Sequence, residues 1–322
     1  MSKVSVIIPA YNRAGIIEDA LNSVFEQTHR PLELVVVDDG STDNTVEVVR
    51  EWIASHRASD STFEAHVFTQ PNKRAPAARN LGILKSTGDY IQFLDSDDVL
   101  YPETIKQKID AIRQSGLPYA YCANDFLDSK GQVIGRCGSP WPESNQGAIA
   151  TYLFHTSGPL IPRSAFDAVG LWDESLVATD EIELFGRLKI HLGRGAYLPE
   201  FGHAQRDHGG DRVSRSGGIG PDPSAREVIK KLFTMVQGTE WDNPTERNAI
   251  ARFGCGVVEA YALSEEYQLA LESLQLSKNI STGKRRNLLS LFLMLERVLP
   301  RKIFFHLYLS ARGRMAKRGS AK

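Results

Sequence analysis

The first hundred residues alternate short apolar runs with segments of helical spacing, and this alternation limits the possible folds more than any other feature. Such a pattern is typical of a parallel sheet built from strand, helix, strand units. The predicted strands are Val4–Ile8, Leu32–Val37, His66–Thr69, Tyr90–Leu94 and Tyr119–Ala123. The predicted helices are Ile16–Gln27, Thr42–His56, Ala77–Lys85 and Pro102–Ser115. We therefore expect an α/β fold with a mainly parallel sheet between helices.

Two segments rich in small and polar residues interrupt the later pattern. Residues 131–158 contain many Gly, Pro, Ser and Asn, which indicates a long connection over a pocket rather than a domain boundary. Residues 180–191 have helical spacing again, and residues 209–223 form a predicted loop rich in Gly, Ser and Arg. Every later segment is predicted helical. We expect an α/β domain over residues 1–220 and a helical extension over residues 221–322.

The cysteines indicate the cellular compartment of the protein, and the charge distribution indicates that its body and its basic end meet different partners. The three cysteines lack C-x-x-C spacing, so neither a disulfide framework nor a zinc cluster is indicated, and a reducing cytoplasm fits best. The formal net charge is −1, but residues 284–322 carry eleven Lys or Arg against one acid, Glu296. The body of the chain is therefore acidic, and its basic end is expected to meet a different partner.

The predicted strand Tyr90–Leu94 ends in three carboxylates, Asp95, Asp97 and Asp98. Like charges this close raise one another's pKa, whereas a divalent metal turns the repulsion into binding. A Mg²⁺ or Mn²⁺ ion there would keep sites open for phosphate oxygens. The alternative is that the acids cap the next helix and face water.

A second acid pair, Asp38 and Asp39, ends the predicted strand Leu32–Val37. The acids that follow these two predicted strands then lie at the carboxyl edge of one sheet, where open parallel sheets bind ligands. The alternative is a helix N-cap, for which the sequence Asp-Gly-Ser-Thr is well suited. The chain has no G-x-G-x-x-G after a predicted strand and no G-x-x-x-x-G-K-[ST], which argues against a dinucleotide dehydrogenase and a P-loop enzyme.

Four motifs in order resemble the family 2 glycosyltransferases of the GT-A fold. They are Val4–Asn12, Leu34–Asp43, Ala77–Gly82 and Gly88–Asp98, and the resemblance extends through residue 215. It implies transfer of a sugar, with inversion, from a nucleoside-diphosphate sugar, of UDP type, to a hydroxyl acceptor. A divalent metal, Mn²⁺ or Mg²⁺, is implied as cofactor, with Asp97 and His208 as its ligands. The implied donor-binding residues are Pro9, Tyr11, Asp38, Asp39, Arg79, Asp95, Ser96, Arg206 and Arg212.

The segment Thr179–Arg187 resembles the region that supplies the family's acceptor-side base. The usual order there is Glu then Asp, but here Asp180 precedes Glu181. Alignment on Leu184 and Arg187 puts Glu181 in the base position, and the departure leaves the role open between the two neighbours. The alternative is that both acids form the first turn of an exposed helix, which the helix dipole favours.

The C-terminal residues 284–309 place apolar runs between basic clusters. The runs are too short and too interrupted to span a bilayer, but they suit helices at an anionic membrane surface. The alternative is packing onto the catalytic domain or onto a partner in a homo-oligomer; nucleic-acid binding is not indicated, because no binding motif accompanies the charge.

A cytoplasmic protein, peripheral on the inner face of the membrane, would fit a saccharide, lipid-linked or polymer acceptor in envelope polysaccharide or glycoconjugate synthesis. Two other functions stay open: a metal-dependent nucleotidyltransferase and a non-catalytic carbohydrate-binding or scaffold protein.

Overall fold

The computed structural model describes residues 2–56, 60–142, 149, 155–177, 179–206, 224–297 and 299–319, except for the side chains of Phe201 and of residues 312–319. The chain divides into two compact units. Unit 1 comprises Met1–Asn145, Tyr152–Leu176 and Asp180–Gly210, and unit 2 comprises Gln146–Thr151, Val177–Thr179 and Asp211–Lys322. Each unit is described by itself.

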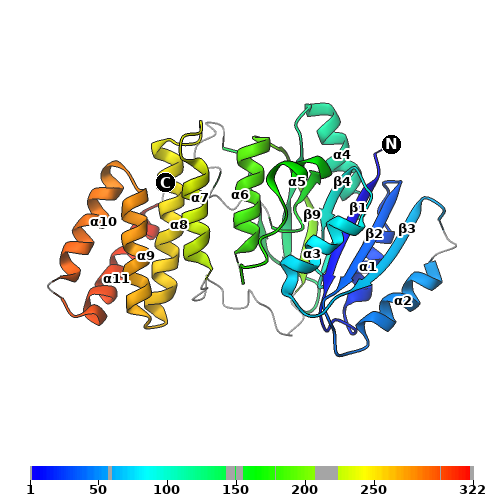
Figure 1. Cartoon of the computed structure of the whole chain (residues 1–322), viewed down its shortest axis with the longest axis horizontal. Coiled ribbons are helices and arrows are strands. Elements are labelled where there is room, and N and C mark those ends of the chain that lie inside the picture. Colours follow the sequence, from blue (N-terminus) through cyan, green and yellow to red (C-terminus); the bar gives the residue numbers. More distant parts are fainter. Residues whose placement is uncertain are drawn as a thin grey trace. The chain divides into compact units, whose positions relative to one another are not determined.

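Unit 1 is built on one sheet, which has nine strands among the described residues, in the order β3-β2-β1-β4-β8-β6-β9-β5, with β7 paired to β6. Strands β1 to β4 pair in parallel, as do β6 and β9, while the other pairs are antiparallel. Helices lie on the sheet as Figure 1 shows. The predicted α/β fold is confirmed. The strands are β1 (Val4–Ala10), β2 (Leu32–Asp38), β3 (Phe63–Thr69), β4 (Tyr90–Phe93), β5 (Asp98–Leu100), β6 (Ala120–Leu127), β7 (Val133–Cys137), β8 (Pro159–Pro162) and β9 (Ala196–Arg206).

The helices of unit 1 follow the predicted ones where the strands are parallel. Four of them, α1 to α4, lie within the first 115 residues, and α6 begins at Asp180 as predicted. The prediction did not include α5, β5, β7, β8 or β9. The helices are α1 (Ile17–Phe25), α2 (Thr45–His56), α3 (Arg74–Lys85), α4 (Thr104–Ser115), α5 (Arg163–Val169) and α6 (Asp180–Leu192).

Alternate residues of the central strand β1 face opposite layers, as the two-residue repeat of a strand requires. Val4, Val6 and Ile8 are fully buried in a core that also contains side chains of α1, α2 and α4. Ile7 faces the other layer, where it lies against Gly82 of α3. Because both faces of the sheet are covered here, the sequences of β1 and β2 are mostly apolar along their whole length, which is typical of buried parallel strands.

Gly82 allows α3 to approach β1 closely. A Cβ atom added at Gly82 would lie 2.3 Å from Cγ2 of Ile7, a branched side chain in a filled core. We expect Gly82→Ala to lower the free energy of unfolding by about 1–3 kcal/mol, as overpacking does. Gly15→Ala is the control, since nothing lies within 4 Å of its Cβ position. Urea unfolding measures both, and equal stability of the two variants would contradict this account of the α3 packing.

Unit 2 contains the helices α7 to α11. Asn243 caps α8 by accepting hydrogen bonds from the backbone N–H groups of Thr245 and Glu246, at 3.0 and 3.1 Å. Gly254 lets α8 meet α9, because a Cβ there would lie 2.3 Å from Oγ of Ser277. The bounds are α7 (Ala225–Val236), α8 (Pro244–Leu263), α9 (Tyr267–Ile280), α10 (Gly283–Glu296) and α11 (Arg301–Gly319).

Within the part of the chain that the structure describes, none of these helices combines the length and the apolar character needed to cross a lipid bilayer.

Candidate active site

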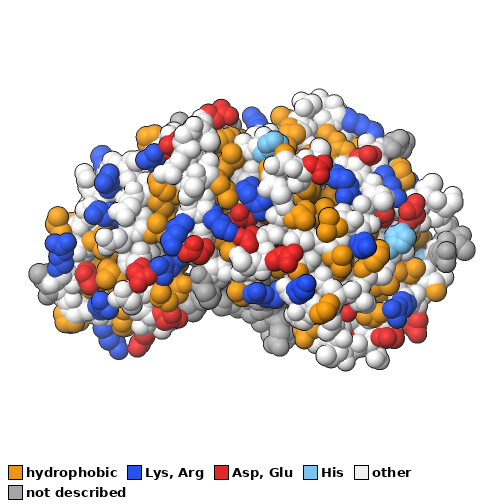
Figure 2. All heavy atoms as spheres, viewed as in Figure 1, with side chains coloured by type: hydrophobic (Ala, Val, Ile, Leu, Met, Phe, Trp, Pro, Cys, Tyr) orange, Lys and Arg blue, Asp and Glu red, His pale blue; other side chains and the backbone are white. Residues whose placement is uncertain are grey.

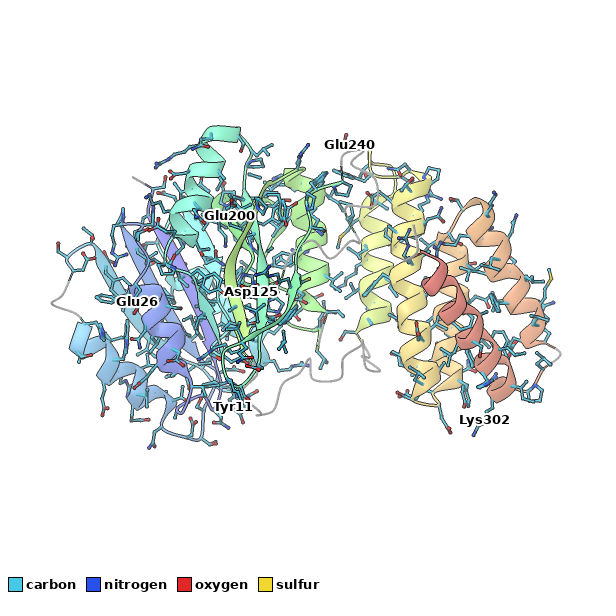
Figure 3. All side chains as sticks on the ribbon, turned by 180° about the vertical axis from the view of Figure 1, so that it is seen from behind. Tyr11, Glu26, Asp125, Glu200, Glu240 and Lys302 are labelled. Atoms are coloured by element: carbon cyan, nitrogen blue, oxygen red, sulfur yellow. The ribbon has the colours of Figure 1, made fainter. Side chains whose placement is uncertain are left out.

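The loops after β1 and β2 are joined by hydrogen bonds at the carboxyl edge of the sheet. The backbone N–H of Asn12 donates to Oγ of Ser41 at 2.8 Å, and Oδ1 of Asn12 accepts from the N–H of Thr42 at 2.8 Å. Asn12 has a positive φ of 53°, a conformation that non-glycine residues adopt mainly where the surroundings impose it. Pro9 is buried in β1, while Tyr11 is 43% exposed and is labelled in Figure 3.

Asp39 and Asp38 are both buried, and their carboxylates have different partners. Asp39 accepts from Nε2 of Gln70 and from the backbone N–H groups of Lys73 and Arg74, at 2.7–2.8 Å. Oδ2 of Asp38 accepts from the N–H groups of Gly40 and Ser41, whereas its buried Oδ1 has no hydrogen-bond partner among the described residues. Asp39 therefore organises the turn between β3 and α3, and Asp38 keeps one acceptor unused.

The acids after β4 are spread over a turn that leads into β5. Asp98 begins β5 and is buried, Ser96 is also buried, and Asp95 and Asp97 are partly exposed. Arg206, at the end of β9, donates from Nε to the carbonyl oxygen of Asp97 at 3.0 Å.

The rest of the Arg206 guanidinium also has protein partners. It contacts the carboxylate of Asp19 in α1 and the carbonyl oxygen of Ile16, the residue that precedes α1. In this structure Arg206 therefore fixes the acidic turn against α1.

Asp95, Asp98 and His155 form a group that could hold a metal ion. Each offers one ligand atom, and the three atoms lie within 4.8 Å of one another. Nε2 of His155 lies 2.7 Å from the side-chain amide nitrogen of Gln205, and the buried Nδ1 of His155 has no hydrogen-bond partner among the described residues. Asp97 does not belong to this group.

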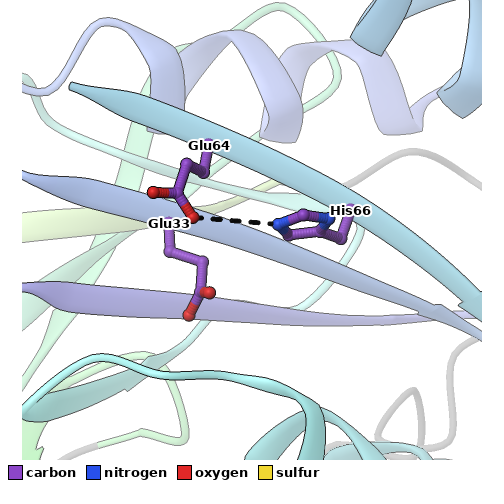
Figure 4. Close-up of side chains that lie close together, drawn as sticks. All are labelled: Glu33, Glu64 and His66. Atoms are coloured by element: carbon purple, nitrogen blue, oxygen red, sulfur yellow. Dashed lines mark ion pairs between the residues drawn. The ribbon is translucent and has the colours of Figure 1, made fainter. Parts of the chain in front are cut away.

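Glu33, Glu64 and His66 form a second such group near the amino ends of β2 and β3 (Figure 4). Nζ of Lys3 lies 3.6 Å from a carboxylate oxygen of Glu33 and 3.0 Å from one of Glu64, so the lysine forms ion pairs with both acids. Burial would raise the pKa of Glu33, but hydrogen bonds from Ser5 and Thr87 outweigh it and lower the pKa. This group lies at the opposite end of the strands from the acidic turn and stabilises the sheet.

Arg79 of α3 links the acidic turn to the start of α6. Its two terminal nitrogens donate to Oδ1 of Asp95 at 2.9 Å and to Oδ2 of Asp180 at 3.0 Å. The guanidinium also lies 4.6 Å from the ring centroid of Trp172. The Arg79 side chain is only 8% exposed; burial opposes its charge, but Asp95 and Asp180 outweigh that effect and raise its pKa.

The two acids that begin α6 differ in environment. Burial raises the pKa of Asp180 to about 6; the charges of Glu181 and Asp95 add to that shift, and Arg79 opposes it. Glu181 accepts a hydrogen bond from Oγ1 of Thr156 at 2.5 Å. Asp180 thus has the raised pKa of a group able to exchange a proton near neutral pH.

Of the residues selected from the sequence, Arg79 joins Asp95 and Asp180 by hydrogen bonds, and Glu181 follows Asp180 at the start of α6. The group that could hold a metal ion adds Asp98 and His155. His208 and Arg212 lie outside the described residues. His155 is not among the residues selected from the sequence, because it has no ligand spacing along the chain, and Asp98 is predicted only as one of three acids that follow a strand.

The model of the family described as "Glycosyl transferase family 2" matches residues 5–157, which include β1 to β7 and the acidic turn. This part of the chain is a glycosyl transferase family 2 domain. Over 133 residues, 41% of this chain, it is 37% identical to an uncharacterized glycosyltransferase of Rickettsia felis. The match covers 21% of that protein, so it spans about a fifth of the length of this curated relative.

Solved structures similar to this chain extend the fold comparison beyond the family 2 domain. S. aureus TarS 1–349 in complex with UDP-GlcNAc gives a TM-score of 0.70 at 20% identity, covering 89% of this chain and 86% of that one. The mannosyltransferase PcManGT from Pyrobaculum calidifontis, in complex with GDP-Man and Mn²⁺, gives 0.57 at 19% identity, covering 94% and 83%. At these identities the likeness supports the GT-A fold alone.

Proposed function

We propose that the protein is an inverting glycosyltransferase that moves a sugar from a nucleoside-diphosphate sugar to a hydroxyl group of an acceptor. The observation that carries this proposal is the Asp95–Arg79–Asp180 bridge within and beside a family 2 domain. It joins Asp95, in the acidic turn after β4, to an acid suited to proton transfer. Donor and acceptor groups could therefore react between the two.

The donor would lie along the carboxyl edge of the sheet, over residues 1–220. Pro9, Tyr11, Asp38 and Asp39 would surround the base, with the ribose or sugar at Asp95 and Ser96. The unused Oδ1 of Asp38 supplies a buried acceptor for such a ligand. A UDP-type donor is proposed; the similar structures contain UDP-GlcNAc or GDP-Man.

A divalent cation, Mn²⁺ or Mg²⁺, is proposed as the cofactor. Two carboxylates and an imidazole within 4.8 Å fit the ligand chemistry of Mn²⁺, and PcManGT was solved with that ion. If Gln205 turns its amide oxygen toward Nε2–H of His155, the buried Nδ1 keeps its lone pair for a metal. Asp97 and His208 are the ligands that the motif implies, so the two sets make different predictions. When bound, the cation would neutralise charge on the departing diphosphate.

In the proposed step the bond between the anomeric carbon and the diphosphate oxygen breaks as the acceptor oxygen forms a new bond to that carbon. Asp180 takes the proton of the acceptor hydroxyl, for which its pKa of about 6 is suitable. Arg79 holds that carboxylate in place by its hydrogen bond to Oδ2. Glu181, held by Thr156, would orient the acceptor beside it.

The acceptor is proposed to be a saccharide, a lipid-linked sugar or a polymer of the cell envelope. The helical residues 221–322 would form a second functional part, and the basic residues 284–322 would attach the protein peripherally to an anionic membrane surface. A cytoplasmic location agrees with the free cysteines Cys122, Cys137 and Cys255.

A thermal-stability panel tests the proposed donor site. Each nucleoside diphosphate and nucleotide sugar is added to the full chain with and without Mn²⁺, because a ligand of the folded state raises the unfolding midpoint by mass action. We expect a metal-dependent rise with one base. Release of pyrophosphate instead of nucleoside diphosphate during turnover would indicate a nucleotidyltransferase, and binding without turnover would indicate a non-catalytic protein.

The same assay separates the two metal-ligand sets. If His155 holds the ion, His155→Gln is expected to weaken the apparent affinity for Mn²⁺ by about tenfold or more, while the metal-free shift with the nucleotide stays unchanged. His66→Gln, in the Lys3-neutralised group, is the matched control and should behave as the unmodified protein. Loss of the Mn²⁺ effect in Asp97→Asn but not in His155→Gln would favour the motif-based set.

A further inference from the structure

Helix α10 exposes an unusual set of side chains. Leu291 is 55% exposed and Met294 63%, and Leu288 and Leu295 are also exposed. At 100° per residue these four residues lie on one face of the helix, opposite the buried Leu289. We refer to Leu288, Leu291, Met294 and Leu295 as the apolar stripe.

Basic side chains lie beyond the two ends of the apolar stripe. Lys284 and Arg286 are exposed at the start of α10, and Arg297 is exposed just after its end. The single acid of α10, Glu296, lies 3.7 Å from Arg301 and is thus neutralised within the unit. In Figure 2 hydrophobic and basic side chains lie next to one another over this helix. The surface is therefore apolar along the stripe and cationic at both ends of the helix.

The start of α11 is anchored while its outer side is open. Phe304, Phe305 and Tyr308 are buried, and Tyr267 of α9 stacks on Phe305 with ring centroids 5.6 Å apart. Lys302, labelled in Figure 3, and Ile303 point outward from the same turn. The exposed apolar side chains thus sit on helices that the core of unit 2 already holds.

We infer that the apolar stripe of α10 inserts into the headgroup region of an anionic lipid membrane, with the flanking basic side chains contacting lipid phosphates. This inference rests on the proposed membrane attachment of residues 284–322 and names the face and the lipid class. Exposed leucines with Lys or Arg near them favour binding of a helix in the plane of such a surface. Anionic headgroups attract each basic residue further.

Charge decides between a membrane and the other partners of an apolar face. Two copies of this chain meeting stripe to stripe would bring Lys284, Arg286 and Arg297 of each toward those of the other, which is unfavourable. A nucleic acid would match the charge but not the aliphatic centre, since stacking on bases needs aromatic side chains. An anionic lipid surface matches both parts.

The test measures cosedimentation of the full chain with vesicles. One set contains phosphatidylcholine and phosphatidylglycerol in equal parts, and the other contains phosphatidylcholine alone. We expect binding to the anionic vesicles only, weakened by salt because the Debye length shortens. Absence of binding to anionic vesicles overturns the inference.

Paired variants test the stripe itself. Leu291→Ser with Met294→Ser is expected to weaken vesicle binding by on the order of tenfold or more. Changing Lys284, Arg285 and Arg286 together to Gln is expected to weaken it by on the order of 100-fold. The matched control is Leu263→Ser, which removes a leucine that is 69% exposed in the same unit but outside α10. Because all the replaced leucines and methionines are exposed, thermal unfolding should not change.

Two further outcomes separate the explanations. If the unmodified chain is a dimer in light scattering and Leu291→Ser with Met294→Ser makes it monomeric, the stripe is a subunit interface and the membrane inference is wrong. Nucleotide binding by thermal shift is measured on the same samples. Retained nucleotide binding without vesicle binding rejects only the membrane inference, and vesicle binding without any nucleotide effect rejects only the proposed glycosyltransferase.

Discussion

Asp180→Asn is expected to lower the turnover of sugar transfer by on the order of 10²–10⁴-fold, the usual contribution of a general base. The amide keeps the shape and one hydrogen-bond acceptor but cannot take the hydroxyl proton. Asp180 has a pKa of about 6, so its deprotonated, basic fraction rises as the pH increases through that value. The rate of the unmodified enzyme should therefore increase between pH 5 and pH 7. We call this rise the acid limb of the pH profile, and it should be absent from the residual rate of the variant.

Glu181→Gln is the matched control for Asp180→Asn, because it makes the same chemical change one residue later in α6. Its Oε1 can still accept the hydrogen bond from Thr156, so we expect a loss of less than about tenfold in turnover and an unchanged acid limb. The reverse result, a large loss in Glu181→Gln and a small one in Asp180→Asn, would assign the base to Glu181, the position that motif alignment favours.

Arg79→Ala is expected to lower the free energy of unfolding by about 3–5 kcal/mol, the cost of breaking a buried ion pair by removing one partner. Arg79 is 8% exposed, and its loss leaves Asp95 and Asp180 at 26% and 15% exposure without their shared cation. Packing on Trp172 is lost as well. Urea unfolding of the full chain measures the change.

A triple variant tests whether the loss of stability in Arg79→Ala comes from the two carboxylates left without their cation. Arg79→Met combined with Asp95→Asn and Asp180→Asn removes all three charges, and we expect it to be more stable than Arg79→Ala alone. A change of less than about 1 kcal/mol in Arg79→Ala would mean that the pair is no stronger than an exposed salt bridge.

The parallel half of the fold could be predicted because its signals are local. The strands β1, β2 and β4 are mostly apolar runs, and the helices between the parallel strands have their own spacing. Three of the missed strands depend on partners distant in sequence: β8 pairs with β4 and β6, and the three-residue β5 pairs with β9. A run as short as Asp98–Leu100 has no period to detect.

The site was predictable where acids follow strands or begin a helix. Asp95 and Asp180 stand in such places, and the structure joins them through Arg79. His155 was not, because it precedes β8 in a segment without regular spacing, and only the sheet pairing brings it to Asp98. The connection of Arg206 to α1 was equally non-local, since Asp19 lies far earlier in the chain.

Asp39 accepts three hydrogen bonds from the turn of residues 70–74, so the conformation of this turn depends on Asp39. If the base of the nucleotide rests beside Asp39, as we propose, its pocket wall is a turn rather than a single carboxylate. Exchanging Asp39 alone would leave the donors of Gln70, Lys73 and Arg74 without this acceptor. Redesign of the nucleotide preference therefore requires transplanting residues 70–74 from another enzyme together with the acid that holds them.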